Sequence, residues 1–274
     1  MAHDQEVHDH DRGLSHDLPT LLSRRRALTL LGGAGLAAAL AGCGAATTAN
    51  DSSSAATATS AAGTAAAGTE IPEETAGPYP GDGSNGVNVL TESGIVRSDI
   101  TTSFGSASGV AQGVPLTIEL KVLDTSDGSV GLQGAAVYLW HCNIDGRYSL
   151  YSEGVTQENY LRGVQETGDD GSVTFTSIYP AAYSGRWPHI HFEVYPSLEA
   201  ATTAGSKLRT SQLALPEGAC KLVYATDGYS QSLQTMAQTS LDTDNVFSDG
   251  YSLQLATVTG NANDGMTATL NVPV

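Results

Sequence analysis

The pattern of hydrophobic and polar residues after about residue 110 is typical of short β-strands. Residues 116–122 alternate strictly, with Leu116, Ile118, Leu120 and Val122 on one face, which predicts a half-buried strand. Residues 135–142 are almost all apolar, as expected of a strand near the centre of a sandwich. The same reasoning predicts further strands at 171–178, 189–195, 208–215, 220–224, 252–258 and 266–272.

Turn-forming residues separate these segments, as in the Asp-Asp-Gly sequence at 169–171 and the Asn/Asp/Gly-rich stretch at 261–265. Many short strands joined by such turns favour an all-β sandwich or barrel. Residues 231–239 are compatible with one short helix, and the polar run 242–250 is expected to be a loop. The sequence therefore predicts an all-β domain.

The first 42 residues have the pattern of an export signal. Three arginines at 24–26 precede an apolar run at 28–40, and Leu-Ala-Gly-Cys at 40–43 follows at once. The run is too short to cross the ~30 Å hydrocarbon core of a bilayer. The arginines resemble a twin-arginine signal and the last four residues a bacterial lipobox, in which Cys43 is acylated. We expect a lipoprotein at the outer face of the cell membrane, or an extracellular protein.

Residues 43–72 are mainly Ala, Thr, Ser and Gly, with almost no bulky side chains. Such a segment cannot bury enough apolar surface to offset its conformational entropy. We expect a flexible tether here, which leaves 73–274 as the globular domain.

The chain is acidic, with 12 Lys and Arg against 29 Asp and Glu and a formal net charge of -17. Nucleic-acid partners are disfavoured, because phosphates require Lys and Arg to neutralise them. A solvated acidic surface explains the charge, and it suits a protein that stays soluble outside the cell.

Only three histidines follow the predicted signal, and two of them form the sequence His189-Ile190-His191. Side chains two apart on a strand share a face, so both imidazoles would project side by side as half of a metal site. The third, His141, shares a predicted face with apolar residues and is expected to be structural. Because no Asp or Glu lies in the loop before His189, an iron(II) site with two histidines and a carboxylate has no obvious third ligand.

Tyrosines could complete the site. Tyr148 follows the predicted strand 135–142, and Tyr183 lies in a Pro/Gly-rich loop before His189. Two phenolates with two imidazoles would favour trivalent iron over zinc or iron(II), but on spacing alone either tyrosine is better explained as a packing aromatic.

The order of these motifs resembles the intradiol ring-cleavage dioxygenases, which include protocatechuate 3,4-dioxygenases and catechol 1,2-dioxygenases. The resemblance covers Trp140-His141-x-Asn-x-x-Gly-x-Tyr148, Pro180-x-x-Tyr183 and Arg186-x-x-His189-x-His191. It implies a mixed β-sandwich domain over 73–274 that opens catechol rings between the two hydroxyl-bearing carbons with O2. It also implies an iron(III) cofactor whose ligands are Tyr148, Tyr183, His189 and His191.

The resemblance implies further site residues. Arg186 would stabilise charge during ring opening, and Gln212 would be the active-site glutamine. Tyr183 would exchange a proton with the substrate. Tyr79, in Thr75-Ala-Gly-Pro-Tyr79, would help to wall the substrate pocket.

Several alternatives stay open at this point. The domain could be a surface-anchored binding module without catalysis, or its histidines could hold copper or zinc. The substrate is not specified: a carboxylated catechol would require a cation beyond Arg186, for which Arg147, Arg162 and Arg209 are candidates. A homo-oligomer is possible.

A disulfide is also expected. If Cys43 carries lipid, two cysteines remain in an exported domain, which favours a bridge between Cys142 and Cys220.

Overall fold

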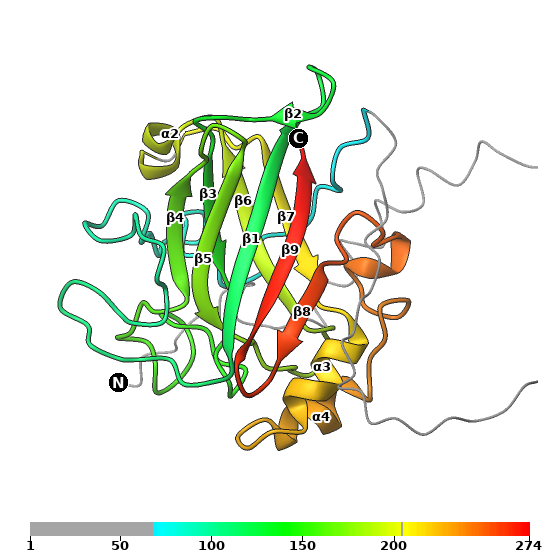
Figure 1. Ribbon diagram of the computed structural model, residues 1–274. Coiled ribbons are helices and arrows are strands. Elements are labelled where there is room, and N and C mark those ends of the chain that lie inside the picture. Colours follow the sequence, from blue (N-terminus) through cyan, green and yellow to red (C-terminus); the bar gives the residue numbers. More distant parts are fainter. Residues whose placement is uncertain (1–67, 204) are drawn as a thin grey trace, which may run out of the picture. The chain divides into compact units, whose positions relative to one another are not determined.

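Two stacked β-sheets form the centre of the computed structural model, which describes residues 68–203 and 205–274 (Figure 1). One sheet has the strand order β2-β1-β9-β8, with β5 also paired to β1. Its strands are β1 (Pro115–Asp124), β2 (Val130–Gly131), β5 (Ser172–Ile178), β8 (Thr257–Asn261) and β9 (Gly265–Pro273). The pairing of β1 with β9 is parallel and the others are antiparallel, so this sheet is mixed.

The second sheet is antiparallel throughout, with the order β4-β3-β6-β7. Its strands are β3 (Ala136–Trp140), β4 (Arg162–Glu166), β6 (His189–Tyr195) and β7 (Arg209–Ala214). Short helices lie at the ends of the sandwich: α2 (Leu198–Thr202) at one end, and α3 (Glu217–Tyr224) and α4 (Ser230–Met236) at the other (Figure 1). A 3-10 turn, η2, covers Phe247–Asp249.

Strict alternation of side chains determines which face of each strand is buried. Along β1, Leu116 and Ile118 are buried while Glu119 points outward, as the sequence pattern predicts. The alternating apolar residues of β3, β6 and β9 meet those of β1 in one cluster between the sheets. Burial of this cluster provides the main stabilisation of the fold, at about 25 cal/mol per Å² of apolar surface. The predicted all-β sandwich is confirmed.

Six of the predicted strands are found at or within a few residues of their expected positions. The helix expected within 231–239 is also found, as α4, which begins one residue earlier, at Ser230, and ends at Met236. The strand predicted at 252–258 is wrong over most of its length, because residues 251–255 form a turn in which the N–H groups of Gln254 and Leu255 donate to the Tyr251 carbonyl. The strand β8 begins only at Thr257.

The strand predicted at 220–224 is also wrong, because these residues belong to helix α3. Ala219, Cys220, Val223 and Tyr224 are buried at helical spacing, and the intervening Lys221 forms an ion pair with Glu217 one turn earlier. Conversely, β4 was not predicted, because its sequence Arg-Gly-Val-Gln-Glu contains a single large apolar residue.

The expected Cys142–Cys220 disulfide is absent: both thiols are free and buried. Cys142 packs on the outer side of the four-stranded sheet, where its Sγ lies 3.6 Å from the Ala181 carbonyl. Cys220 faces the core between the sheets from α3, with Sγ 3.3 Å from the Tyr179 hydroxyl. Helix α3 thus directs Cys220 towards Tyr179 and not towards Cys142. Burial raises the pKa of both thiols to about 12, which keeps them protonated.

The N-terminal predictions lie mostly outside the described residues. The signal 1–42, Cys43 and most of the tether 43–72 are among the residues that the structure leaves undescribed. Ile71, at the end of the expected tether, is fully buried, and its N–H donates to the Pro273 carbonyl at 2.8 Å. In the described part of the chain, no helix is long and apolar enough to cross a membrane.

Candidate metal centre

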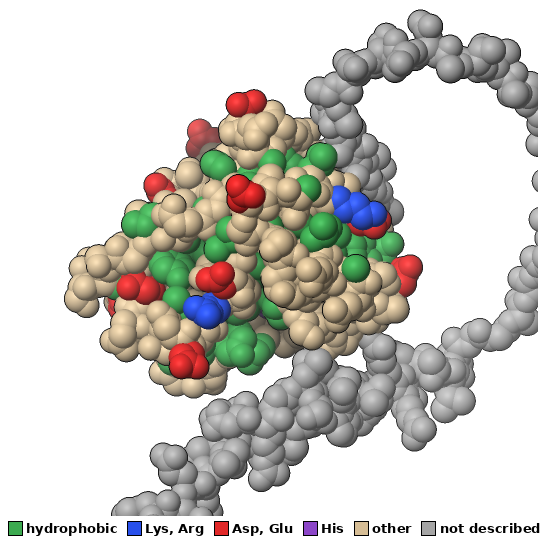
Figure 2. Space-filling view, turned by 90° about the horizontal axis from the view of Figure 1, so that it is seen from below, with side chains coloured by type: hydrophobic (Ala, Val, Ile, Leu, Met, Phe, Trp, Pro, Cys, Tyr) green, Lys and Arg blue, Asp and Glu red, His purple; other side chains and the backbone are tan. Residues whose placement is uncertain are grey.

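The two histidines of β6 lie on the outer face of the four-stranded sheet. Ile190, Phe192 and Val194 point into the core between the sheets, so His189 and His191 must point away from it. Both imidazoles are nonetheless buried, because the segment 74–80 and the loop 143–152 cover this face. Figure 2, which looks at one end of the domain, shows no histidine at the surface in that view.

Four candidate ligand atoms converge at this place. His189 Nε2 lies 3.1 Å from His191 Nε2 and 3.0 Å from the Tyr183 hydroxyl. The Tyr148 hydroxyl lies 3.2 Å from both His191 Nε2 and the Tyr183 hydroxyl, and 3.5 Å from His189 Nε2. The residues come from three different parts of the chain, and the fold brings together all four ligands that the resemblance implied.

Neighbouring groups orient each imidazole. His189 Nδ1 lies 2.5 Å from the Trp187 carbonyl, to which it can only donate, so the lone pair is on Nε2 and faces the other three groups. The His191 ring stacks on Trp140, with centroids 4.9 Å apart and planes 6° apart. Gly77 packs against the opposite side of the site: a Cβ built on it would lie 3.4 Å from His191 Cε1.

The chemistry of these donors fits a metal ion of high charge. Burial, together with the nearby Arg186 guanidinium, lowers the pKa of His189 and His191 well below 6.5, so both are neutral ligands near pH 7. Burial raises the pKa of both phenols, Tyr148 and Tyr183, so a strong Lewis acid is required to hold them as phenolates. Ligand atoms 3.0–3.5 Å apart suit one ion bound at about 2.0–2.2 Å. The four residues therefore fit an iron(III) ion.

The described residues contain no group of three or more His, Cys, Asp or Glu side chains that could hold a metal ion. The candidate centre thus depends on its two tyrosines, which are hard anionic oxygen donors once deprotonated. Tyr148 is 2% exposed, whereas Tyr183 is only partly buried and is the more accessible of the two.

Arg186 reaches the centre from the loop before β6. Its Nη1 lies 3.3 Å from His189 Nε2, and its Nη2 donates to Gln212 Oε1 at 2.5 Å. On the side away from the metal ligands, Nε donates to Asp244 Oδ2 at 2.9 Å. The strand register aligns Gln212 of β7 with His191 of β6, so both predicted residues, Arg186 and Gln212, lie at the site.

Asp244 belongs to the run 242–250, for which the sequence predicted only a loop. The side chain is completely buried and accepts hydrogen bonds from Arg186, from the Trp187 N–H at 2.7 Å and from the N–H groups of Val246 and Phe247. It therefore fixes both Arg186 and the backbone that orients His189.

The segment 74–80 forms one wall of the site. Glu74 N donates to the carbonyl of Thr210 in β7, and Gln212 Nε2 donates to the Thr75 carbonyl at 2.9 Å. Tyr79 packs against the Tyr148 ring, with centroids 5.0 Å apart, and is 36% exposed. Tyr79 thus contacts a candidate ligand from a partly exposed position.

Arg162 anchors this wall from behind. Its guanidinium is buried and donates to the Tyr79 and Pro80 carbonyls at 2.9 and 2.8 Å. The remaining N–H groups donate to Tyr138 and Ser149. Arg162 therefore has no free donor for a substrate, although the sequence left that role open.

A second carboxyl group lies at the edge of the site. Glu74 is partly buried, and its Oε1 lies 3.4 Å from Gln254 Nε2. Burial and the nearby Asp249 raise the pKa of Glu74 to about 7. Sequence reasoning did not find Glu74 or Asp244 as site residues, and it named Arg162 only as a candidate substrate cation, not as the anchor of the wall. The polar strand around Arg162 and the Asp-rich run around Asp244 gave no periodic signal.

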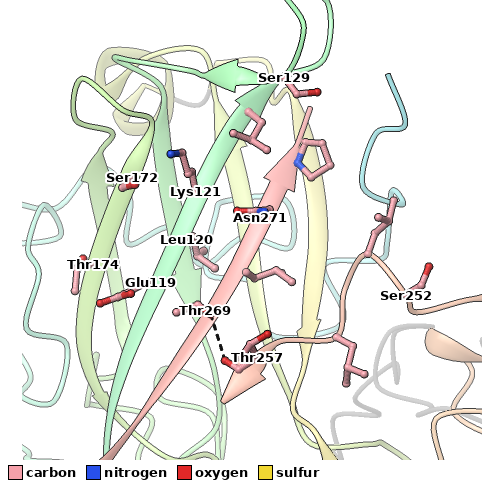
Figure 3. A pocket seen from close by; sticks show the side chains of 15 residues that line it. Glu119, Leu120, Lys121, Ser129, Ser172, Thr174, Ser252, Thr257, Thr269 and Asn271 are labelled. Atoms are coloured by element: carbon pink, nitrogen blue, oxygen red, sulfur yellow. Dashed lines mark hydrogen bonds between the residues drawn. The ribbon is translucent and has the colours of Figure 1, made fainter. Parts of the chain in front are cut away.

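Another concavity lies on the outer face of the five-stranded sheet, on β1, β5 and β9 (Figure 3). Glu119, Lys121, Thr174 and Asn271 line it, next to the turn at 252–255. None of the candidate metal ligands lies there, because they project from the other sheet.

Comparison with known proteins shows similarity to dioxygenases. A family profile described as Dioxygenase matches residues 95–193, the range that contains the four candidate ligands and Arg186. Chlorocatechol 1,2-dioxygenase of Rhodococcus opacus is 31% identical over 91 residues, which are 29% of this chain and 35% of the relative. Hydroxyquinol 1,2-dioxygenase of Rhizobium sp. strain MTP-10005 is 35% identical over 72 residues, which are 26% of this chain and 24% of the relative. The chain thus matches about a third or less of the length of these two relatives.

Among solved structures, an intradiol ring-cleavage dioxygenase from Tetranychus urticae has a TM-score of 0.58 with this chain. The match covers 75% of this chain and 94% of that chain, at 23% identity. This similarity confirms the mixed β-sandwich fold.

Proposed function

Since this chain belongs to the intradiol ring-cleavage dioxygenase family, we propose that it is an iron(III) enzyme that opens catechol rings with O2 between the two hydroxyl-bearing carbons. The product would be a muconate-type diacid that keeps both catechol oxygens and both atoms of O2. The observation that supports this most strongly is the convergence of Tyr148, Tyr183, His189 and His191 within hydrogen-bonding distance of one another.

In this proposal the four residues would hold iron(III), which when bound supplies the Lewis acidity and redox chemistry for the reaction of catechol with O2. The protein orients the ligands: the Trp187 carbonyl fixes the tautomer of His189, and Trp140 supports the ring of His191.

Tyr183 is the residue best placed to exchange a proton with the substrate. Its hydroxyl faces both the metal position and the accessible side of the site, whereas Tyr148 is buried beneath Tyr79. As a phenolate, Tyr183 Oη could accept a proton from a catechol hydroxyl group.

Arg186 would supply fixed positive charge where negative charge develops on the opening ring. Its orientation is determined before substrate binds, because Asp244 holds Nε and Gln212 accepts from Nη2. Gln212 and the segment 75–79 would then confine the substrate against the ligands.

The optical spectrum of the iron-loaded, full-length protein tests the ligand assignment. We expect a red to burgundy colour from charge transfer between tyrosinate and iron(III). Tyr148→Phe and His189→Ala should lose iron or colour, while Tyr251→Phe, which alters a tyrosine outside the site, should keep both. Full iron content and unchanged colour in both site variants would contradict the assignment.

The same spectrum separates the proposal from the two alternatives. Neither a zinc site nor a binding module without metal has a visible charge-transfer band, and copper would be identified by metal analysis.

A further inference from the structure

Arg162, in β4, is 1% exposed, and its guanidinium makes five hydrogen bonds, one for each of its N–H groups. All five acceptors are backbone carbonyls or hydroxyl groups, and in the described part of the chain Arg162 forms no ion pair with a carboxylate. A buried arginine of this kind adds little net stability, because the cost of desolvating its charge offsets the hydrogen bonds. Its planar set of donors can, however, fix the relative positions of the groups that accept from it.

Two of the five bonds hold the loop that carries Tyr148. Arg162 Nε donates to Ser149 Oγ at 3.1 Å, and Nη2 donates to the Ser149 carbonyl at 3.0 Å. Ser149 directly follows Tyr148, and its hydroxyl also donates to the Tyr160 carbonyl at 2.7 Å. Arg162 therefore fixes the backbone from which the candidate ligand Tyr148 projects.

The other three bonds reach the wall 74–80 and Tyr138. Arg162 Nη1 donates to the Pro80 carbonyl at 2.8 Å and to the Tyr138 hydroxyl at 3.0 Å, and Nη2 donates to the Tyr79 carbonyl at 2.9 Å. The Tyr138 hydroxyl itself donates to the Pro80 carbonyl at 2.6 Å. The Pro80 carbonyl thus joins the wall to both side chains.

Arg162 is also aligned with a candidate ligand across the four-stranded sheet. The strands β4, β3 and β6 are neighbours (Figure 1), and their register places Arg162 opposite Trp140 and Trp140 opposite His191. The Tyr138 ring stacks on Trp140, with centroids 4.9 Å apart and planes 22° apart, and Trp140 stacks in turn on His191. The bond from Arg162 to Tyr138 thus supports a row of rings that ends at His191.

We infer that Arg162 is a positioning residue that couples the wall 74–80 to two of the candidate ligands, Tyr148 and His191. The inference rests on the proposed iron(III) site. The hydrogen bonds of Arg162 end at the wall, at Ser149 and at Tyr138 rather than at a ligand atom, so it acts through the groups that it holds. Because one rigid guanidinium connects all three, its loss alters the wall and the ligand geometry together.

Arg162→Lys tests this inference in the iron-loaded, full-length protein. Lysine keeps the positive charge but cannot reach Ser149, Pro80 and Tyr138 at once. We expect iron binding, measured by competition with a chelator, to weaken by roughly 10- to 100-fold, which is typical when a ligand loses an outer contact. The tyrosinate charge-transfer band should shift, and KM for catechol should rise because the wall loosens.

Arg97→Lys is the matched control. Arg97 also donates to backbone carbonyls, those of Thr102, Asn159 and Arg162, but among the described residues it bonds to neither the wall nor a candidate ligand. Both variants lose a guanidinium that ties segments together, so both should lower the free energy of unfolding. Only Arg162→Lys should also change the iron affinity, the band and KM, which a purely structural role would leave unchanged.

Tyr138→Phe provides a second, milder variant. Its ring can remain stacked on Trp140, while the hydroxyl that links Arg162 with Pro80 is removed. We expect a smaller change of the same kind as in Arg162→Lys. The double variant should bind iron no more weakly than Arg162→Lys alone, because both changes break the same network.

Wild-type iron affinity, band position and KM in Tyr138→Phe would overturn the inference, if Arg162→Lys also keeps these values or does not fold. Equal changes in Arg97→Lys and Arg162→Lys would overturn it too, and so would losses that add in the double variant. An iron-loaded wild-type protein without a charge-transfer band would instead contradict the proposed function itself.

Discussion

Asp244 and Arg186 form a buried ion pair 2.9 Å long directly behind the candidate metal ligands. The Asp244 carboxylate also accepts a hydrogen bond from the backbone N–H of Trp187. The backbone carbonyl of the same Trp187 accepts a hydrogen bond from His189 Nδ1. A single carboxylate outside the ligand set thus connects the arginine of the site with the orientation of one of its histidines.

We predict that Asp244→Asn lowers kcat by roughly ten- to a hundredfold, because it weakens a charge-assisted hydrogen bond of about 1.5–3 kcal/mol that orients Arg186. Iron content and colour should change little, because Asn keeps an oxygen that can accept the Trp187 N–H. Asp242→Asn, in the same loop but exposed, is the matched control. Asp244 should act through Arg186, so the double variant with Arg186→Lys should be no slower than Arg186→Lys alone. Additive losses would show that Asp244 acts independently.

Arg186→Lys should bind iron normally and lower kcat and kcat/KM together by about a hundredfold. Lysine is a point charge that cannot keep the contacts to Asp244 and Gln212 while it faces the metal position. Arg209→Lys, at a surface ion pair, should have normal kinetics. An unchanged kcat in Arg186→Lys would exclude the proposed role.

The burial of His141 leads us to predict that the stability of the protein depends on pH. It is buried, with Nε2 2.7 Å from the Ser177 hydroxyl and Nδ1 2.8 Å from the Cys142 carbonyl, which confirms its structural role. Burial lowers its pKa from 6.5 to about 4. Between these values the unfolded chain binds a proton that the folded protein does not, so the free energy of unfolding falls as the pH falls. The difference between these two pKa values corresponds to a change of about 3 kcal/mol in the free energy of unfolding.

Denaturant unfolding of His141→Gln at several pH values checks this. The variant should be less stable near pH 7, and its free energy of unfolding should depend less steeply on pH between about 4 and 6.5. Parallel pH profiles for the two proteins would contradict the prediction.

Cys43, which lies outside the described residues, is predicted to be acylated and to hold the protein on the outer face of the cell membrane. An acyl chain contributes about 0.8 kcal/mol per buried CH2 group to membrane binding. Cys43→Ala should therefore move the protein from the membrane fraction to the soluble fraction. Equal retention of variant and wild type in membranes would reject the lipid anchor.

The sequence allowed prediction of the sandwich and of the cluster of candidate metal ligands, because both depend on local signals. The alternation in β1 and the spacing of His189 and His191 each define a strand face without reference to the rest of the chain. The ordered tyrosine and histidine motifs then identified residues that the fold brings within 3.0–3.5 Å of one another.

The supporting residues could not be predicted, because their roles depend on contacts distant in sequence. Asp244 is 58 positions from Arg186, and Arg162 is 83 positions from the Tyr79 carbonyl that it anchors. The disulfide prediction failed for a related reason: it assumed that 220–224 was a strand, whereas helical packing of α3 points Cys220 towards Tyr179.

The most direct test of ring cleavage by this chain is product analysis with oxygen-18-labelled O2. The iron-loaded, full-length protein would be incubated with catechol, and the product would be identified by mass spectrometry. We predict a muconate-type diacid that contains both labelled oxygen atoms and is not formed by His189→Ala. A ring opened beside the two hydroxyl-bearing carbons, an unlabelled product or no consumption of O2 would contradict the account.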